Sequence, residues 1–394
     1  MRIRDLIQTV AAAAFSQGVL FLLQTYLVFT HRFSEVISLG KYSGLFSLIF
    51  FLCDGNSGLV FGVVRRNHGV EAAHAGFLIY RMLSFSAAVV AMFVYAFVSP
   101  HDATWVVPTV LLSLALRAPW IDGYLDASGR LALAVVLSNF WTLCVCIAAI
   151  ALQRVDAMVV GIGAVAGSAV MALARLALRG RGAGGGQSVS FSRPALAASG
   201  EIFRFMGLYG YGQIYGRLTV FAMGAFFAGP AAALALHGKQ VFNISGLVVS
   251  YIRRLEVSST ATASASSEKW NVREMLFSGV SQLLTAAGGA VVVFIAGATS
   301  HMLLFALLIA LWQTFEKISG NCVYAFQLMN KHALGYGSLI FVSCMGAIGI
   351  FTGRLFHNVN IYLLAETAAF CIILCFWAAT YLSYRRQEPA LAEG

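Results

Sequence analysis

The chain has 394 residues, of which 59% are hydrophobic and only 11% are charged, and its mean hydropathy is +0.81. A soluble domain carries roughly a quarter of its residues charged, so this composition excludes a water-soluble globular protein. A net charge of +10 would favour nucleic acid as the partner of a soluble protein, but here the placement of the charges predicts membrane topology.

Apolar stretches long enough to cross a bilayer as helices recur from one end of the chain to the other. The first follows a basic start, Met1-Arg2-Ile3-Arg4, and is too long for a signal-peptide core, so we expect a retained signal anchor. The predicted membrane-spanning helices are residues 8–30, 42–64, 75–98, 105–125, 131–152, 158–178, 202–228, 232–252, 276–299, 302–328, 334–353 and 359–382.

The lysines and arginines outside these stretches or at their ends support a count of twelve helices. With both termini in the cytoplasm, sixteen of them lie in inward-facing segments and only four in outward-facing ones. Such an excess on the cytoplasmic side is the usual signature of orientation. The outward set is Arg32, Lys41, Arg154 and Arg354.

Two long polar breaks, 179–201 and 253–275, are rich in Gly or in Ser, Thr and Ala, and we expect flexible cytoplasmic loops there. We therefore predict an all-α membrane protein with about twelve transmembrane helices in two six-helix bundles around a central cavity, with both termini cytoplasmic. The N-terminal bundle would be residues 1–178, the linker 179–201 and the C-terminal bundle 202–394.

Charged side chains inside the predicted helices are costly, so each is a candidate functional residue. Basic side chains outnumber clearly buried acidic ones there, and a cavity with surplus guanidinium groups favours an anionic guest such as pyrophosphate. Arg117, Arg217 and Lys317 are expected roughly 18 to 22 Å from the starts of their helices. The opposing expectation is that Asp54 or Glu316 pairs with an arginine of a neighbouring helix as a buried salt bridge.

Polar faces on two apolar helices should turn toward a water-filled cavity. Gln213 and Arg217 share a face because they are four residues apart, and Gln17 and Gln24 share one because they are seven apart. Aromatic side chains such as Tyr215 could stack there on sugar rings.

Two stretches carry a family resemblance. The first runs from Phe15-Ser16-Gln17-Gly18 through Leu39-Gly40-Lys41-Tyr42 to Asp54-Gly55 and Arg65-Arg66, and the second comprises Gly216-Arg217-Leu218, Gly229-Pro230 and Lys239-Gln240-Val241-Phe242. With twelve helices, the chain resembles the polysaccharide exporters and O-antigen flippases of the multidrug/oligosaccharidyl-lipid/polysaccharide superfamily. It departs from that family at Gly216, where an acidic residue often stands, and at Gly55, where a hydrophobic residue usually follows the aspartate.

The resemblance implies a V-shaped pair of bundles in the bacterial inner membrane that flips an undecaprenyl-pyrophosphate-linked oligosaccharide by alternating access, for surface polysaccharide biosynthesis. Its partners would be this lipid-linked oligosaccharide, membrane lipids and other polysaccharide-assembly proteins, and nucleic acid is not expected. Carried over by position, Arg217 and Lys239 would line the cationic lumen.

The sequence thus predicts a transporter with a substrate site and an ion-coupling site, without enzyme activity, cofactor or metal. The substrate-binding candidates are Arg81, Arg117, Arg217, Lys239, Lys317, Gln17, Gln24, Gln213 and Tyr215. The candidates for coupling to H⁺ or Na⁺ are Asp54, Glu316 and Glu366. The seven cysteines lie in apolar runs without metal-ligand spacing and are expected to be buried thiols.

Three alternatives rank lower. A multidrug or cation antiporter of the same superfamily usually has a carboxylate in its first helix, and residues 8–30 contain none. A major-facilitator carrier would show a basic, glycine-bounded loop at 65–74, which the sequence lacks. A membrane-embedded glycan-modifying transferase would need a catalytic pair, and His101-Asp102 beside Pro100 is expected to be a solvated turn.

Overall fold

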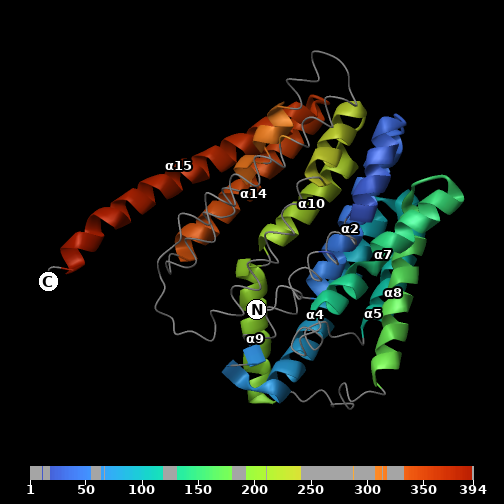
Figure 1. Ribbon diagram of the computed structural model, residues 1–394, viewed down its shortest axis with the longest axis horizontal. Coiled ribbons are helices and arrows are strands. Elements are labelled where there is room, and N and C mark those ends of the chain that lie inside the picture. The colour runs from blue at the N-terminus through green and yellow to red at the C-terminus, as the bar shows by residue number, and fades with distance from the viewer. Residues whose placement is uncertain are drawn as a thin grey trace. The chain divides into compact units, whose positions relative to one another are not determined.

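The structure is a computed structural model of the chain. It describes residues 11, 18–54, 64–65, 67–118, 131–179, 192–209, 211–240, 287, 307–312, 314–316 and 332–392, which form helices and short connections without a strand among them (Figure 1). The chain divides into two compact units, Met1–Ala225 with Ser250–Ser258, and Phe226–Val249 with Ser259–Gly394.

Five helices within the described ranges are long and apolar enough to cross a membrane: Phe33–Asp54, Val70–Val98, Ala157–Ala174, Ala333–Leu355 and Val359–Thr380. Each has at least the roughly 18 residues that a hydrocarbon core of about 30 Å requires. The prediction of an all-helical, multi-pass membrane protein is therefore confirmed at this level. The count of twelve, the two six-helix bundles, their boundaries and the cytoplasmic termini stay predictions.

The N-terminal unit contains most of the described helices. They are residues 18–29, α2 (Phe33–Asp54), α4 (Val70–Val98), α5 (Pro100–Arg117), α7 (Leu131–Leu152), α8 (Ala157–Arg179), α9 (Arg193–Tyr209) and nearly all of α10 (Tyr211–Phe226).

Helices α7 and α8 pack side by side and antiparallel (Figure 1). A Cβ added to Gly163 would lie 2.5 Å from the Cα of Val145, and one added to Gly167 would collide with the backbone of Trp141. The absence of side chains at these two residues lets the backbones of the two helices approach closely.

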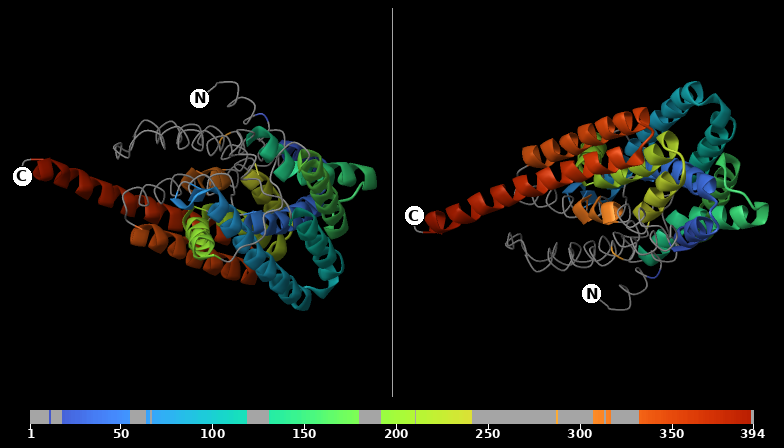
Figure 2. Two further views of the ribbon diagram at one scale, coloured as in Figure 1. Left: turned by 90° about the horizontal axis from the view of Figure 1, so that it is seen from below. Right: turned by 90° about the horizontal axis from the view of Figure 1, so that it is seen from above.

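The C-terminal unit is built around α14 (His332–Leu355) and α15 (Val359–Ala392), which form an antiparallel pair (Figures 1 and 2). Helical residues 230–240, 307–312 and 314–316 also belong to this unit. The ring of Tyr362 in α15 lies 5.9 Å from that of Phe227 and 6.3 Å from that of Trp312. Tyr362 and Trp312 are completely buried, so aromatic packing holds these segments on α15.

Several predicted boundaries are correct and others are wrong. Helix 131–152 is α7, and helix 158–178 is α8 to within one residue at each end. Helix α2 begins at Phe33 rather than at residue 42. The helix predicted at 202–228 falls on α9 and α10, and α9 begins at Arg193, inside the predicted linker. Helix α9 packs on α4 through the buried cluster of Ala73, Phe77, Ala198 and Ile202.

Candidate functional site

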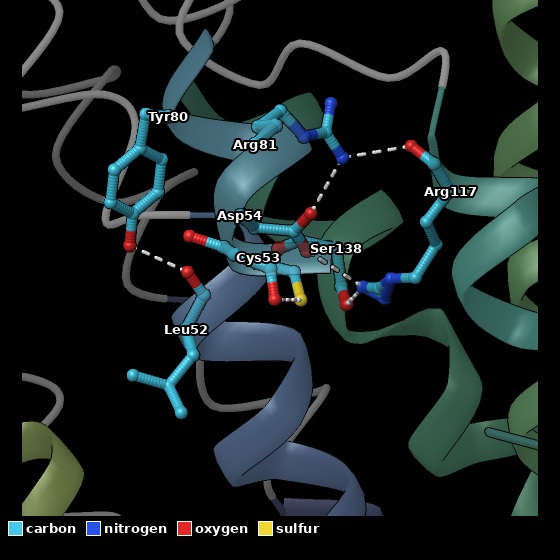
Figure 3. A network of polar contacts seen from close by, with 8 residues as sticks. Leu52, Cys53, Asp54, Tyr80, Arg81, Arg117 and Ser138 are labelled. Carbon is cyan, nitrogen blue, oxygen red and sulfur yellow. Dashed lines mark hydrogen bonds and ion pairs between the residues drawn. The ribbon is translucent and has the colours of Figure 1, made fainter. Parts of the chain in front are cut away.

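Asp54, Arg81 and Arg117 form a buried cluster of charges in the N-terminal unit (Figure 3). Nη2 of Arg81 lies 2.9 Å from Oδ1 of Asp54, and Nη2 of Arg117 lies 3.4 Å from Oδ2 of the same carboxylate. Nη2 of Arg81 also donates a hydrogen bond to the backbone carbonyl oxygen of Arg117 at 2.8 Å, and Nη2 of Arg117 donates one to that of Ser138 at 2.9 Å. One carboxylate therefore bridges two guanidinium groups from different helices.

Three helices bring these side chains together from distant parts of the sequence. Asp54 is the last residue of α2, Arg117 is the last residue of α5, and Arg81 lies about 16 Å along α4 from its first residue. Nearer the starts of α2 and α5, Lys41 of α2 pairs with Asp102 of α5. Helices α2 and α5 therefore run in the same direction, and α4 runs between them in the opposite one, as the predicted alternation of spans requires.

The cluster holds more positive charge than negative. Arg81 is 4% exposed and Arg117 is 1% exposed, while the side chain of Asp54 is 15% exposed. Nε of Arg81 and both Nε and Nη1 of Arg117 have no hydrogen-bond acceptor among the described residues. A buried donor without a partner costs roughly 1 to 3 kcal/mol, and more when it is charged. Within the described part of the chain, the two arginines thus share one negative charge and leave three nitrogens without an acceptor.

Aromatic rings line the guanidinium groups of this cluster. The ring centroid of Phe50 lies 4.0 Å from the guanidinium carbon of Arg117, and that of Phe85 lies 5.8 Å from the guanidinium carbon of Arg81. Phe50 packs edge-on against Trp141 of α7, with ring centroids 5.6 Å apart. A cation over an aromatic face gains about 0.5 to 2 kcal/mol, which offsets part of the cost of burying the charge.

His101 and Asp102 do not form the turn that the sequence predicts. Helix α4 ends at Val98 and α5 begins at Pro100, so both residues lie in the first turn of α5. The Asp102 carboxylate pairs with Lys41, and the hydroxyl of Tyr95 lies 3.5 Å from the same oxygen. Pro100 was the signal for this helix start, since proline is favoured at the first helical position, where its missing N–H costs nothing.

A second buried cluster lies in the C-terminal unit. Lys239 forms an ion pair with Glu316, and its Nζ lies 4.7 Å from the ring centre of Trp312. Nε1 of Trp312 donates a hydrogen bond to Oε2 of Glu366 at 2.7 Å. Lys239, Trp312 and Glu366 are each at most 1% exposed. This arrangement joins two carboxylates to one lysine through a single indole ring.

The structure thus pairs several of the predicted site residues with one another. Asp54 pairs with arginines of neighbouring helices, as the salt-bridge expectation had it, whereas Glu316 pairs with a lysine. Two arginines share one aspartate in the first cluster, so a positive surplus persists there. In the second cluster Lys239 and Glu316 balance each other.

The depth predicted for Arg117 is wrong because the helix boundaries differ. Arg117 is the last residue of α5, about 26 Å from its start, rather than in the middle of a helix 105–125. Arg217 lies on α10, six residues after Tyr211. The guanidinium carbon of Arg217 lies 4.5 Å from the ring centroid of Phe51 in α2.

The remaining candidates have different surroundings. Gln24 is almost completely buried, and its amide nitrogen and oxygen find no hydrogen-bond partner among the described residues. Tyr215 is half-buried on α10. Gln17, Lys317 and the side chain of Gln213 lie outside what the structure describes.

Three residues of these clusters were not predicted from the sequence. The carbonyl oxygen of Ser138 accepts a hydrogen bond from Arg117, and no sequence signal marks a backbone oxygen for that role. Phe50 and Trp312 lie against cations. Each is four residues from a carboxylate, Asp54 and Glu316 respectively, and this helical spacing could have placed ring and carboxylate on one face.

The cysteines offer no metal site within the described ranges, where no group of three metal-ligating side chains occurs. Cys53 and Cys146 are buried free thiols, as expected. Cys344 and Cys375 are exposed, contrary to the prediction; they lie within helices apolar enough to face lipid. Cys322 lies outside the described residues.

Comparisons with known proteins show similarity to solved structures. No protein-family model matches the chain, and no curated protein matches it in sequence. Among solved structures, the chain is similar to an Asp-to-Asn mutant of the MATE transporter VcmN of Vibrio cholerae. The alignment covers 98% of this chain and 97% of that chain, with 15% sequence identity and a TM-score of 0.41.

Proposed function

We propose that the chain is a transporter of the multidrug/oligosaccharidyl-lipid/polysaccharide superfamily that flips an anionic, undecaprenyl-pyrophosphate-linked oligosaccharide across the bacterial inner membrane. Alternating access would expose the site to each side in turn, and the lipid tail would stay in the bilayer. The partners in this proposal are the lipid-linked oligosaccharide, membrane lipids and other proteins of surface polysaccharide assembly.

The observation that supports an anionic cargo most strongly is the ratio of charges at Asp54. Two nearly fully buried arginines face one carboxylate, and three of their nitrogens lack an acceptor among the described residues. A pyrophosphate group would supply both the negative charge and the oxygens, because guanidinium groups bind phosphate oxygens in a bidentate manner.

The C-terminal cluster supports a role in ion coupling. Glu366 is 1% exposed and accepts a hydrogen bond from the neutral indole of Trp312. A carboxylate buried at membrane depth is a candidate to carry a proton or a sodium ion. Lys239, proposed from the sequence as a cargo ligand, is occupied by Glu316 in this structure and would have to exchange partners to bind cargo.

A second candidate function is an ion-coupled multidrug antiporter of the same superfamily, which the same two carboxylates, Glu316 and Glu366, favour. Such a protein binds cationic, amphiphilic drugs and needs a carboxylate that alternates between drug and proton. The excess of arginine around Asp54 would repel a cationic drug from that cluster, so we rank this function second.

Complementation of cells that lack the chain distinguishes the two candidate functions. Complementation with Arg117→Gln or Arg81→Gln should leave surface polysaccharide strongly reduced at normal protein abundance. The matched control is Arg204→Gln, because Arg204 is exposed on α9, and it should restore normal polysaccharide. Normal polysaccharide with both cluster variants would refute the flippase, and increased drug accumulation in the deletion strain would favour the antiporter.

A further inference from the structure

Asp54 occupies the place that an anionic cargo would need. Its two carboxylate oxygens face two different guanidinium groups, Oδ1 toward Arg81 at 2.9 Å and Oδ2 toward Arg117 at 3.4 Å. A phosphate group bridging two arginines would contact the same donor atoms, since it also presents several oxygens around one centre. Both cannot be bound to these nitrogens at once.

The contact between Asp54 and Arg117 is the looser of the two. At 3.4 Å it is an ion pair beyond the usual length of a charge-assisted hydrogen bond, about 2.7 to 2.9 Å. Arg117 keeps Nε and Nη1 without acceptors among the described residues, although its side chain is almost completely buried. The guanidinium group of Arg117 is therefore held by the backbone carbonyl oxygen of Ser138, while two of its nitrogens donate no hydrogen bond among the described residues.

If the cargo displaces Asp54 from the two arginines, the side chains around it offer no other cation, so its new partner would be a proton. Besides the two arginines, the titratable side chains near it are Cys53, adjacent in α2, and Tyr80 of α4. The Tyr80 hydroxyl donates to the carbonyl oxygen of Leu52 at 2.6 Å, and Sγ of Cys53 lies 3.9 Å from the carbonyl oxygen of Ser84. Among the described residues, no cation other than Arg81 and Arg117 pairs with Asp54. Once displaced, the carboxylate would be a bare charge in a buried site, a costly state that protonation removes.

We infer that Asp54 is a displaceable counterion, which holds Arg81 and Arg117 when no cargo is bound and takes up one proton from water when an anionic head group replaces it. This inference rests on the proposed function and deepens it, because it makes proton uptake part of cargo binding. The charges balance. The two arginines and Asp54 together carry one net positive charge, and protonation of Asp54 raises it to two. A head group with two negative charges neutralises that total.

The test counts protons during anion binding to the purified full-length protein. Inorganic pyrophosphate is titrated calorimetrically in two buffers of different ionisation enthalpy, for the wild type and for Asp54→Asn. Pyrophosphate changes its own protonation on binding, so the difference between the two proteins isolates Asp54. The control is Asp156→Asn, whose carboxylate pairs with Arg154 at an exposed position.

We expect the wild type and Asp156→Asn to take up about one proton more than Asp54→Asn. We also expect Asp54→Asn to bind pyrophosphate roughly ten- to a hundredfold more tightly, because the competing charged partner is gone. Equal proton uptake by all three proteins would overturn the exchange while leaving an anion site intact. Weaker binding by Asp54→Asn than by the wild type would overturn it as well.

A separate outcome concerns the proposed function itself. If neither the wild type nor Asp54→Asn binds pyrophosphate, the arginine cluster is no anion site and both proposals fail together. Sulfate, which does not titrate near neutral pH, provides the same proton count on the wild type alone if Asp54→Asn does not fold. Sulfate binding without proton uptake would again overturn the exchange.

Discussion

Nη2 of Arg81 donates a hydrogen bond to the backbone carbonyl oxygen of Arg117 at 2.8 Å, while the side chains of both residues pair with Asp54 (Figure 3). Two like charges are thus held close together by one backbone oxygen and one carboxylate. Such an arrangement is stable only while a negative charge is present between the guanidinium groups. The stability of the N-terminal unit should therefore depend on what occupies that position.

Asp54→Asn should destabilise the protein by about 3 to 5 kcal/mol, because it leaves two buried arginines without a counterion. Added sulfate should raise the melting temperature of this variant more than that of the wild type, since the anion would replace the missing charge. Thermal unfolding in detergent with increasing sulfate measures both effects. Equal shifts in the two proteins would contradict the prediction.

Lys239→Gln should cost about 3 to 5 kcal/mol, because the largely buried carboxylate of Glu316 would lose its ion pair with the lysine. The double variant Lys239→Gln with Glu316→Gln should recover part of that loss, since neither charge is then left alone. A double-mutant cycle of unfolding free energies gives the coupling between the two residues. Additive losses would mean that the pair does not act as a unit.

Trp312→Phe should lower stability by at least roughly 2 kcal/mol, because the donor to the Glu366 carboxylate is lost and the smaller ring leaves a void at a buried position. Trp105→Phe serves as the matched control, since Trp105 is about half exposed on α5. Thermal unfolding of the two variants should show a clear loss only for Trp312→Phe. If both variants melt at the wild-type temperature, the indole–carboxylate contact contributes nothing to stability.

Gly163→Ala should cost about 1 to 3 kcal/mol through overpacking, because the new methyl group would lie 2.5 Å from the backbone of Val145. Gly200→Ala on α9 meets open space and should be neutral or stabilising by up to about 1 kcal/mol, as alanine favours helix. Melting temperatures of the two variants provide the comparison. A Gly163→Ala protein as stable as Gly200→Ala would show that α7 and α8 can separate without cost.

The sequence predicts helices well where hydropathy alone marks their ends. Helix α7 matches its predicted range, because charged residues flank a predominantly apolar stretch. Prediction fails where helix-start chemistry or packing decides the boundary. Helix α5 starts at Pro100 within the residues expected to form a turn, and α9 extends into the predicted linker because its apolar face packs on α4.

The candidate site follows a similar pattern. The cost of burying charge was enough to select these residues: Asp54, Arg81, Arg117, Lys239 and Glu316. A charge within an apolar helix is destabilising unless it is paired or functional. Which of these residues pair across helices depends on the direction and register of the packed helices, and a single sequence does not determine these. The backbone oxygen of Ser138 and the rings against the cations become visible only once the helices are packed.

In the proposed transporter, Arg81 and Arg117 bind the pyrophosphate of the lipid-linked cargo. This role can be measured as equilibrium binding of a short-chain polyprenyl-pyrophosphate saccharide to the purified protein. We predict saturable binding by the wild type and by Arg204→Gln, weakened at least about tenfold in Arg117→Gln, the loss of roughly one charge-assisted hydrogen bond. Equal affinity of Arg117→Gln and the wild type would show that Arg117 does not bind the cargo.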